Sequence, residues 1–187
     1  MYNEELALIT SFIAMAFVVI SYFVKKKSMY LLFQLLCIVF LIIQYFFSEL
    51  FFAMVGLSVG LLRTLTFFLY ERKGKPAPIL CSFILSAMTV ASYFIVNFLI
   101  LKNAQPLDVL CLIALVAYAF IFRIRNLKIV RFSMIAPTLL SILFNVLTSA
   151  AVFATLTYVF ELGANVVSIF KYHVFKKSEH NSKALES

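Results

Sequence analysis

Apolar residues fill the chain in five long runs, and the segments between the runs are short and polar. The runs cover residues 6–24, 29–70, 79–101, 107–122 and 129–170. A helix needs about 20 mostly apolar residues to cross the hydrocarbon core of a bilayer. Three runs therefore predict one transmembrane helix each, while 29–70 and 129–170, at 42 residues each, are too long for a single crossing.

Each 42-residue run contains a polar pair at which it can fold back. These pairs are Ser48-Glu49 in the first run and Thr148-Ser149 in the second. Breaking the runs there gives seven predicted transmembrane helices. Their expected spans are Leu6–Val24, Met29–Phe47, Leu50–Tyr70, Ile79–Leu101, Leu107–Phe122 and two helices within Ile129–Phe170.

Basic residues fall on alternate connections, and this asymmetry predicts the orientation of the chain. If the N-terminus lies outside, 14 of the 16 Lys and Arg residues lie on the cytoplasmic side. They are Lys25, Lys26, Lys27, Arg72, Lys73, Lys75, Arg123, Arg125, Lys128, Arg131, Lys171, Lys176, Lys177 and Lys183. The outer side then holds Lys102 with Glu4, Glu5, Glu49 and Asp108. We therefore expect the N-terminus outside and the C-terminus in the cytoplasm.

The spacing of the runs also predicts an internal repeat. A shift of 101 residues lays Lys25–Tyr70 over Asn126–Lys171, so each half has three helices. One helix joins the halves, and both therefore enter the membrane in the same sense, as parallel repeats do. The predicted fold is an all-α membrane protein in a 3+1+3 arrangement. Its units are a first repeat at 1–70, a linker with the fourth helix at 71–106, a second repeat at 107–175 and a polar cytoplasmic tail at 176–187.

Composition favours a bilayer over water as the solvent of this chain. Of its 187 residues, 64% are hydrophobic and 13% are charged, and the mean hydropathy is +1.05. A soluble domain of this size cannot hide so much apolar surface. The net charge of +8 comes from short clusters rather than a continuous basic stripe, which disfavours a nucleic-acid partner. The acidic start, Met1–Glu5, is unlike a signal peptide, so we expect the first run to remain as a helix.

The sequence lacks the residue patterns of catalysis and of metal or cofactor binding. Cys37, Cys81 and Cys111 are isolated, and His173 and His180 stand in a basic tail. Neither a disulfide framework nor a zinc site is predicted from such spacing. No Ser/His/Asp set, H-E-x-x-H pair or phosphate-binding glycine loop is present. We expect neither enzymatic activity nor a cofactor.

Three segments resemble the YgjV-type family of small bacterial inner-membrane proteins. They are Val19-Ile20-Ser21-Tyr22-Phe23-Val24-Lys25-Lys26-Lys27-Ser28, Gly60-Leu61-Leu62-Arg63-Thr64-Leu65-Thr66-Phe67-Phe68-Leu69-Tyr70-Glu71 and Phe120-Ile121-Phe122-Arg123-Ile124-Arg125-Asn126. The resemblance covers most of the chain and implies a multi-pass protein of the plasma membrane. More remotely, the 3+1+3 layout is similar to that of SWEET, PQ-loop and nicotinamide riboside carriers. That similarity implies an asparagine in the third helix of each repeat, where this chain has Asn165 and Thr64.

Two charged residues lie deep within apolar runs. Glu161 is in the middle of Ala150–Phe170, and Arg63 occupies a similar depth in the first repeat. A charge at such a depth is costly and by default marks a polar pathway or a buried partner. Asn165 follows Glu161 by four residues and shares its helix face. We expect Arg63, Glu161 and Asn165 either to form a polar site near the midplane or, as a structural Arg63–Glu161 pair, to lock the two halves together.

Further polar residues are candidates for the same pathway. Gln44 and Asn145 correspond in the repeat, and interhelical hydrogen bonding is their simpler interpretation. Thr64 is next to Arg63, and Tyr118 and Tyr158 lie in mid-span. Gly56 and Gly60 form a G-x-x-x-G pattern that predicts close helix packing. Tyr22, Tyr30, Tyr70 and Tyr172 are expected to be interfacial anchors.

The functional expectation is a SWEET-like transporter or facilitator that passes a small polar metabolite by alternating access. The alternative is a non-transporting membrane protein, such as a sensor, an assembly factor or an interaction partner, with a structural Arg63–Glu161 pair. The expected partners are the lipid bilayer and a small polar solute, with homo-oligomerisation left open.

Overall fold

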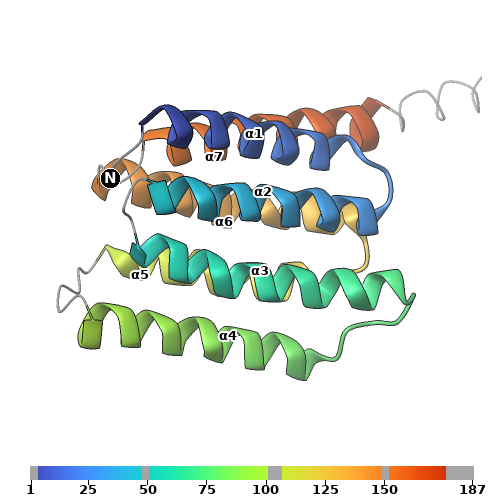
Figure 1. The fold of residues 1–187 in the computed structure, drawn as a ribbon. Helices are drawn as coiled ribbons and strands as arrows, with labels where there is room; N and C mark the ends of the chain where they lie inside the picture. The colour runs from blue at the N-terminus through green and yellow to red at the C-terminus, as the bar shows by residue number, and fades with distance from the viewer. Residues whose placement is uncertain (1–3, 48–50, 101–106, 149–151, 176–187) are drawn as a thin grey trace, which may run out of the picture.

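Every regular element that the computed structural model describes is helical. The described residues are 4–47, 51–100, 107–148 and 152–175. The α-helices are α1 (Glu4–Phe23), α2 (Lys27–Phe47), α3 (Phe51–Arg72), α4 (Ile79–Phe94), α5 (Asp108–Ile121), α6 (Leu127–Thr148) and α7 (Val152–Ile169) (Figure 1). Two π-helical turns, η1 (Ile95–Ile100) and η2 (Phe170–Phe175), extend α4 and α7.

The helices follow the apolar runs closely. Within the described residues, five spans are long and apolar enough to cross a membrane, namely Glu5–Phe23, Lys27–Phe47, Met54–Arg72, Ile79–Phe98 and Leu127–Leu147, and α5 is a shorter apolar helix. Ser48, Glu49 and Ser149, where the two long runs were expected to fold back, lie outside the described residues, as does the tail 176–187. The helices on both sides of each predicted break are described.

Local sequence explains the turn between α3 and α4. Gly74 has a φ of +66°, the left-handed conformation that glycine adopts without steric cost. Its N–H donates to the carbonyl of Glu71, and the N–H of Lys75 donates to the carbonyl of Tyr70. These two bonds satisfy terminal carbonyls of α3 in a Schellman motif. Pro76 and Pro78 follow, and α4 begins directly after Pro78.

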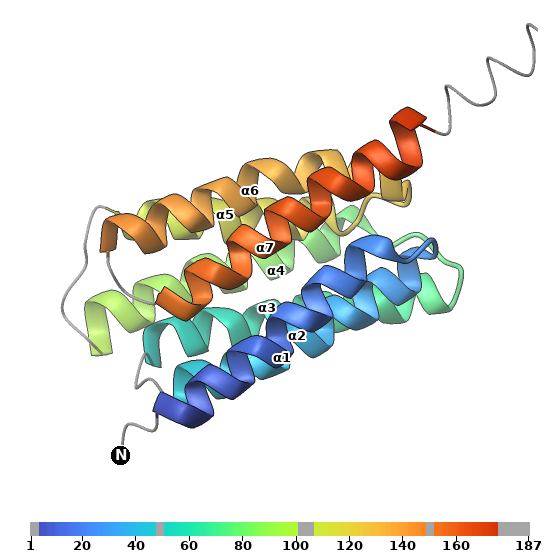
Figure 2. The same cartoon turned by 90° about the horizontal axis from the view of Figure 1, so that it is seen from above.

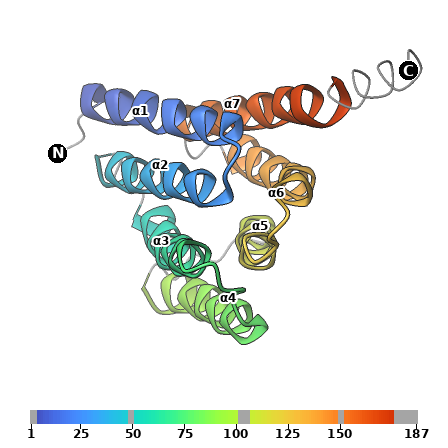
Figure 3. The ribbon, with the colours of Figure 1, turned by 90° about the vertical axis from the view of Figure 1, so that its right-hand side faces the viewer.

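Consecutive helices run in opposite directions and contact one another in chain order. The contacts pass from α1 to α2 and onward to α7, and α7 packs back against α1. The end-on view shows α4 outside, against α3 and α5, while α3 also contacts α5 directly (Figure 3). Six helices, α1, α2, α3, α5, α6 and α7, therefore form a ring closed by their contacts, and α4 lies outside this ring.

The basic clusters gather at one end of the bundle. The connections after α1, α3 and α5 all lie at the end where α7 finishes, as the two side views show (Figures 1 and 2). These connections and the adjoining turns hold Lys25, Lys26, Arg72, Lys73, Lys75, Arg123, Arg125 and Lys128. Because the helices alternate in direction, α1 begins at the opposite end.

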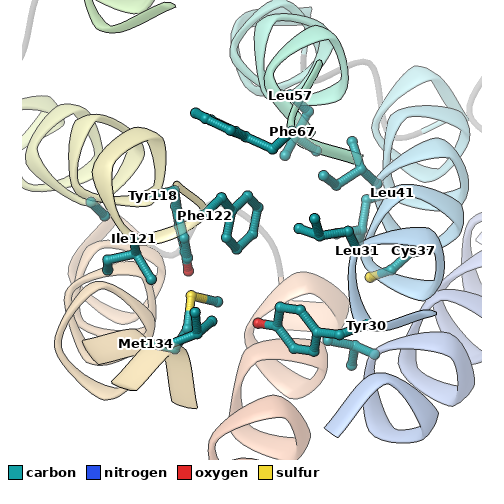
Figure 4. Packing of buried hydrophobic residues seen from close by; sticks show 14 of the residues in the cluster. Tyr30, Leu31, Cys37, Leu41, Leu57, Phe67, Tyr118, Ile121, Phe122 and Met134 are labelled. Atoms are coloured by element: carbon teal, nitrogen blue, oxygen red, sulfur yellow. The ribbon is translucent and has the colours of Figure 1, made fainter. Parts of the chain in front are cut away.

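The outer surface is apolar and the interior contains many polar groups. Ile79, Leu80, Phe83 and Ile84 of α4 are each at least half exposed, whereas Arg63 and Glu161 are each 4% exposed. This distribution suits a lipid solvent, because apolar side chains gain nothing from leaving hydrocarbon. A buried apolar cluster packs between the helices, with Leu31, Leu57, Phe67 and Met134 among its members (Figure 4).

Candidate functional site

Four helices of the ring border a cavity, called the central cavity below. It has about 40 Å³ open to the centres of water molecules, and its lining residues come from α2, α3, α7 and the C-terminal part of α5 with Phe122. A space of this size admits water, since one water needs roughly 10–15 Å³ by that measure. Arg63 and Glu161 are the charged residues that the described lining contains.

Glu161 presents its carboxylate from α7 and is hydrogen-bonded to α1. The hydroxyl of Tyr22 donates to Oε1 of Glu161 over 2.8 Å. The hydroxyl of Tyr30 lies 3.5 Å from that of Tyr22, and the two rings meet edge to face with centroids 5.5 Å apart. Gln34 and Thr157 line the cavity beside Glu161. The hydrogen bond from Tyr22 holds the carboxyl group of Glu161 at the cavity wall.

Arg63 is held on the α3 side by contacts with α5. Its Nη1 donates to the carbonyl oxygen of Leu115 over 2.6 Å. The guanidinium carbon lies 5.2 Å from the centroid of the Tyr118 ring and 5.6 Å from that of Phe122, both within range of a cation–π interaction. The Nε of Arg63 is buried and has no hydrogen-bond partner in the described structure. The cation is therefore fixed in place while part of its hydrogen-bonding capacity remains unused.

Gly60 explains how the guanidinium fits beside its own helix. A Cβ atom added at Gly60 would lie 3.4 Å from Nη2 of Arg63. Glycine at this position leaves room for the arginine head one turn away. The other half of the G-x-x-x-G pattern, Gly56, faces Leu115 of α5, whose Cδ1 would be 3.5 Å from an added Cβ. The pattern thus serves packing of α3 against α5, together with the placement of Arg63.

Arg63 and Glu161 face the same cavity but do not form an ion pair. Across the described residues, an ion pair within 4.0 Å is found between Lys27 and Glu71, at 3.1 Å, and none joins Arg63 to Glu161. The structural pair that the sequence left open as an alternative is therefore not formed. The two charges border one space from helices that lie on different sides of it.

Two of the predicted site residues point to other partners. The Nδ2 of Asn165 donates to the backbone carbonyl of Arg131 over 2.8 Å, tying α7 to α6. The hydroxyl of Thr64 donates to the carbonyl of Gly60 within α3 over 2.9 Å. Both side chains are fully buried and neither lines the central cavity. Sharing a helix face with Glu161 did not bring Asn165 to the same space.

The remaining candidates divide in the same way. Tyr118 and Tyr158 both line the cavity. Gln44 and Asn145 are buried elsewhere, and Oε1 of Gln44 and Nδ2 of Asn145 have no hydrogen-bond partner in the described structure. The cavity therefore brings Arg63, Glu161 and the two tyrosines together, and leaves the two amides outside its lining.

Arg131 and two tyrosines have roles that the sequence interpretation missed. Arg131 was assigned to the cytoplasmic cluster, yet it is 2% exposed and its Nη2 donates to the carbonyls of Tyr22 at 2.9 Å and Val24 at 2.8 Å. Its guanidinium lies 4.9 Å from the centroid of the Tyr172 ring. Tyr22 and Tyr30 were expected at the membrane interface, and both are fully buried.

A helical pattern in the sequence could have identified this arginine. Buried residues of α6 recur at intervals of three and four, which places them on one face. They include Arg131, Met134, Thr138, Ser141 and Asn145. Reading Arg131 as the first member of this stripe, rather than the last member of a loop cluster, predicts its burial.

Comparison with known protein families agrees with this architecture. The model of the Imp-YgjV family, described as a bacterial inner membrane protein, matches residues 5–176. The chain belongs to the Imp-YgjV family. The match runs from the first turn of α1 through η2, and it confirms the resemblance carried by the three quoted segments. As a member of Imp-YgjV, the protein is a multi-pass protein of the bacterial inner membrane.

Comparisons beyond the family give no further relatives. No curated protein and no solved structure matches the chain. The described residues also contain no group of three His, Cys, Asp or Glu side chains that could hold a metal ion. For Imp-YgjV, the chemistry of the site therefore has to be argued from the cavity itself.

Proposed function

We propose that the protein is a transporter or facilitator that passes a small polar solute across the inner membrane through the central cavity. One observation carries the proposal: Arg63 and Glu161 line the same cavity, which has room for water, and no ion pair within 4.0 Å joins them. A buried charge inside a membrane is costly, and in a purely structural role the two would gain by pairing directly. Opposite charges kept apart around a cavity leave both available to a solute.

The packing of the helices supports the 3+1+3 arrangement within this proposal. In this arrangement, a twofold axis along the bundle relates α1, α2 and α3 to α5, α6 and α7. The same axis would turn the contact between α1 and α7 into a contact between α5 and α3. Both of these contacts are present. The peripheral α4 is then the single helix that connects the two repeats. Alternating access would proceed by rocking of one repeat against the other around the central site.

The collection of basic residues at one end supports the orientation. Lys and Arg on short connections favour the cytoplasmic side. The described basic turns after α1, α3 and α5 are at the same end, so this end faces the cytoplasm in the proposed topology. The N-terminus would then face the periplasm.

Contacts at the basic end provide a candidate cytoplasmic gate. Arg131 of α6 holds the last carbonyls of α1, and Asn165 of α7 holds the carbonyl of Arg131. The hydroxyl of Tyr172 donates to the carbonyl of Phe23 over 2.9 Å. These bonds join both repeats on the basic side of Glu161. In this proposal, opening toward the cytoplasm requires these bonds to break, and their presence is what a state closed on that side would have.

The proposal is tested by solute uptake into proteoliposomes. A mixture of polar metabolites is offered outside, and the contents of protein-containing and protein-free liposomes are compared by mass spectrometry. We expect at least one solute to accumulate with the wild-type protein, and Glu161→Gln and Arg63→Gln to reduce its uptake tenfold or more. The matched controls are Glu5→Gln and Arg72→Gln, because both side chains are exposed. If no solute enters faster than into empty liposomes, with gradients imposed in either direction, the alternative of a non-transporting membrane protein is favoured.

A further inference from the structure

The cavity is bipolar, and this polarity bears on what it could bind. Arg63 approaches it from α3 and Glu161 from α7, helices on different sides of the ring (Figure 3). The charges are opposite in sign and are not joined by an ion pair within 4.0 Å in the described structure. Apolar residues, including Ile38, Leu41 and Leu57, also line the cavity.

The α3 side provides a binding position for an anionic group. Arg63 is 4% exposed, its Nη1 donates to the carbonyl of Leu115, and its Nε has no hydrogen-bond partner among the described residues. The rings of Tyr118 and Phe122 hold the guanidinium in place. A planar guanidinium with free N–H groups matches the two oxygens of a carboxylate. A ligand carboxylate would supply the missing acceptor.

The α7 side provides a position for a cationic group. Oε1 of Glu161 accepts one hydrogen bond, from the hydroxyl of Tyr22, which fixes the position of the carboxylate. The carboxylate, with Gln34 and Thr157 beside it, faces the same cavity as the guanidinium. An ammonium group near Glu161 would be attracted to the carboxylate, whereas a lone carboxylate in the cavity would be repelled by it.

These two positions discriminate between classes of solute. A simple anion would be attracted by Arg63 but repelled by Glu161. A simple cation would be attracted by Glu161 but repelled by Arg63. A neutral polyol would leave both buried charges without a counter-charge. A molecule that carries both charges avoids each of these costs.

We propose that the cavity selects small zwitterions of the amino-acid type, with the carboxylate on Arg63 and the ammonium on Glu161. This substrate class rests on the proposed transport function and refines it. The cavity volume of about 40 Å³ corresponds to about three water molecules by the one-water measure, so the smallest amino acids are the expected size. Larger side chains would require the cavity to open.

The test uses the full-length protein in nanodiscs with defined probes. Binding of radiolabelled glycine is measured in competition with β-alanine, acetate, methylamine and ethylene glycol. We expect glycine or β-alanine to bind at least tenfold more tightly than the three compounds that lack one or both charges. The native thiol of Cys37 gives a second measurement, because it lines the cavity and is free. With Cys81 and Cys111 replaced by Ser, a bound zwitterion should slow the reaction of Cys37 with methyl methanethiosulfonate.

Charge-neutralising variants make the test specific. Glu161→Gln removes the repulsion toward anions, so the affinity for acetate relative to that for glycine should rise tenfold or more. Arg63→Gln should shift preference toward methylamine by a similar factor. A change of preference in opposite directions cannot come from misfolding, which would weaken all probes together. Arg72→Gln and Glu5→Gln should keep the wild-type order.

Two outcomes would overturn the inference. The first contradicts only the substrate class, and the second also contradicts the transport function. If acetate, methylamine or ethylene glycol binds as well as the zwitterions, the substrate class is wrong, while transport of another solute remains established by the liposome assay. If no probe binds and no metabolite accumulates in that assay, both the substrate class and the transport function are wrong.

Discussion

The hydroxyl of Tyr22 donates a 2.8 Å hydrogen bond to Oε1 of Glu161, and so connects the first helix to the last across 139 positions of sequence. The same tyrosine contributes its backbone carbonyl to Arg131. One residue of α1 is thus held by α6 through its backbone and by α7 through its side chain. Tyr22 is therefore one of the residues that join the first and second halves of the chain, together with Arg63, Val24 and Phe23.

Removal of the Tyr22 hydroxyl should weaken this connection. Tyr22→Phe leaves the ring in place and takes away a buried hydrogen bond to a carboxyl group, and such bonds contribute about 0.5–3 kcal/mol to the stability of a protein. We expect the midpoint of unfolding in mixed detergent micelles to fall accordingly. Tyr70→Phe, at a partly exposed tyrosine, is the control and should change the midpoint little. The double variant Tyr22→Phe/Glu161→Gln should lose less unfolding free energy than the two single variants lose together, because both substitutions affect the same hydrogen bond.

Substitution of Arg131 should loosen the basic end of α1. Arg131→Gln shortens the side chain and takes away donors to the carbonyls of Tyr22 and Val24. We expect backbone amides in the last turn of α1 to exchange hydrogen about tenfold faster or more, as local opening becomes easier. Arg125→Gln, at an exposed arginine of the same end, should leave exchange in α1 unchanged. Equal exchange in both variants would argue against the gate assigned to Arg131.

Two glycines should respond to alanine in opposite directions. Gly163 lies inside α7 with nothing within 4 Å of an added Cβ, so Gly163→Ala should stabilise the protein by about 0.5–1 kcal/mol through helix propensity. Gly74 has a φ of +66°, and Gly74→Ala should cost about 1 kcal/mol or more because alanine disfavours that region. Unfolding in mixed micelles measures both changes. If Gly163→Ala instead destabilises the protein, the space beside Gly163 must be occupied by another group in a conformation other than this one.

Orientation can be tested with single cysteines in a background where Cys37, Cys81 and Cys111 are replaced by Ser. Lys26→Cys is at the basic end and Glu5→Cys is at the opposite end, and both positions are exposed. We expect a membrane-impermeant maleimide applied to intact spheroplasts to label Glu5→Cys and to spare Lys26→Cys until the membrane is opened. The reverse pattern would place the N-terminus in the cytoplasm.

The helix boundaries were predictable because the bilayer imposes a length on every crossing. The expected spans Leu6–Val24 and Met29–Phe47 differ from α1 and α2 by at most two residues at either end. The prediction for the fourth span, Ile79–Leu101, did not include the change to a π-helix at Ile95. Hydropathy reports which residues prefer lipid and carries no information on the backbone hydrogen-bond pattern inside an apolar run.

The site was predictable only in part, for a related reason. Charge in an apolar run singles out Arg63 and Glu161, because such residues are costly wherever they point. The rotation of each helix about its axis decides whether a neighbour such as Asn165 reaches the cavity, and packing between helices sets that rotation. Tyr22 and Arg131 illustrate the same difficulty. Their positions near helix ends are typical of interfacial residues, while the contacts among α1, α6 and α7 bury them.

The position of α4 has a consequence for how this family is expected to vary. None of the residues that line the central cavity comes from α4, and its outer face is covered with large apolar side chains. Selection for a particular solute would therefore act on the lining residues of α2, α3, α5 and α7, and would leave the outward positions of α4, such as Phe83 and Ile84, free to exchange among apolar residues. Aligned family members should show their fastest substitution there, with hydrophobicity retained and identity lost.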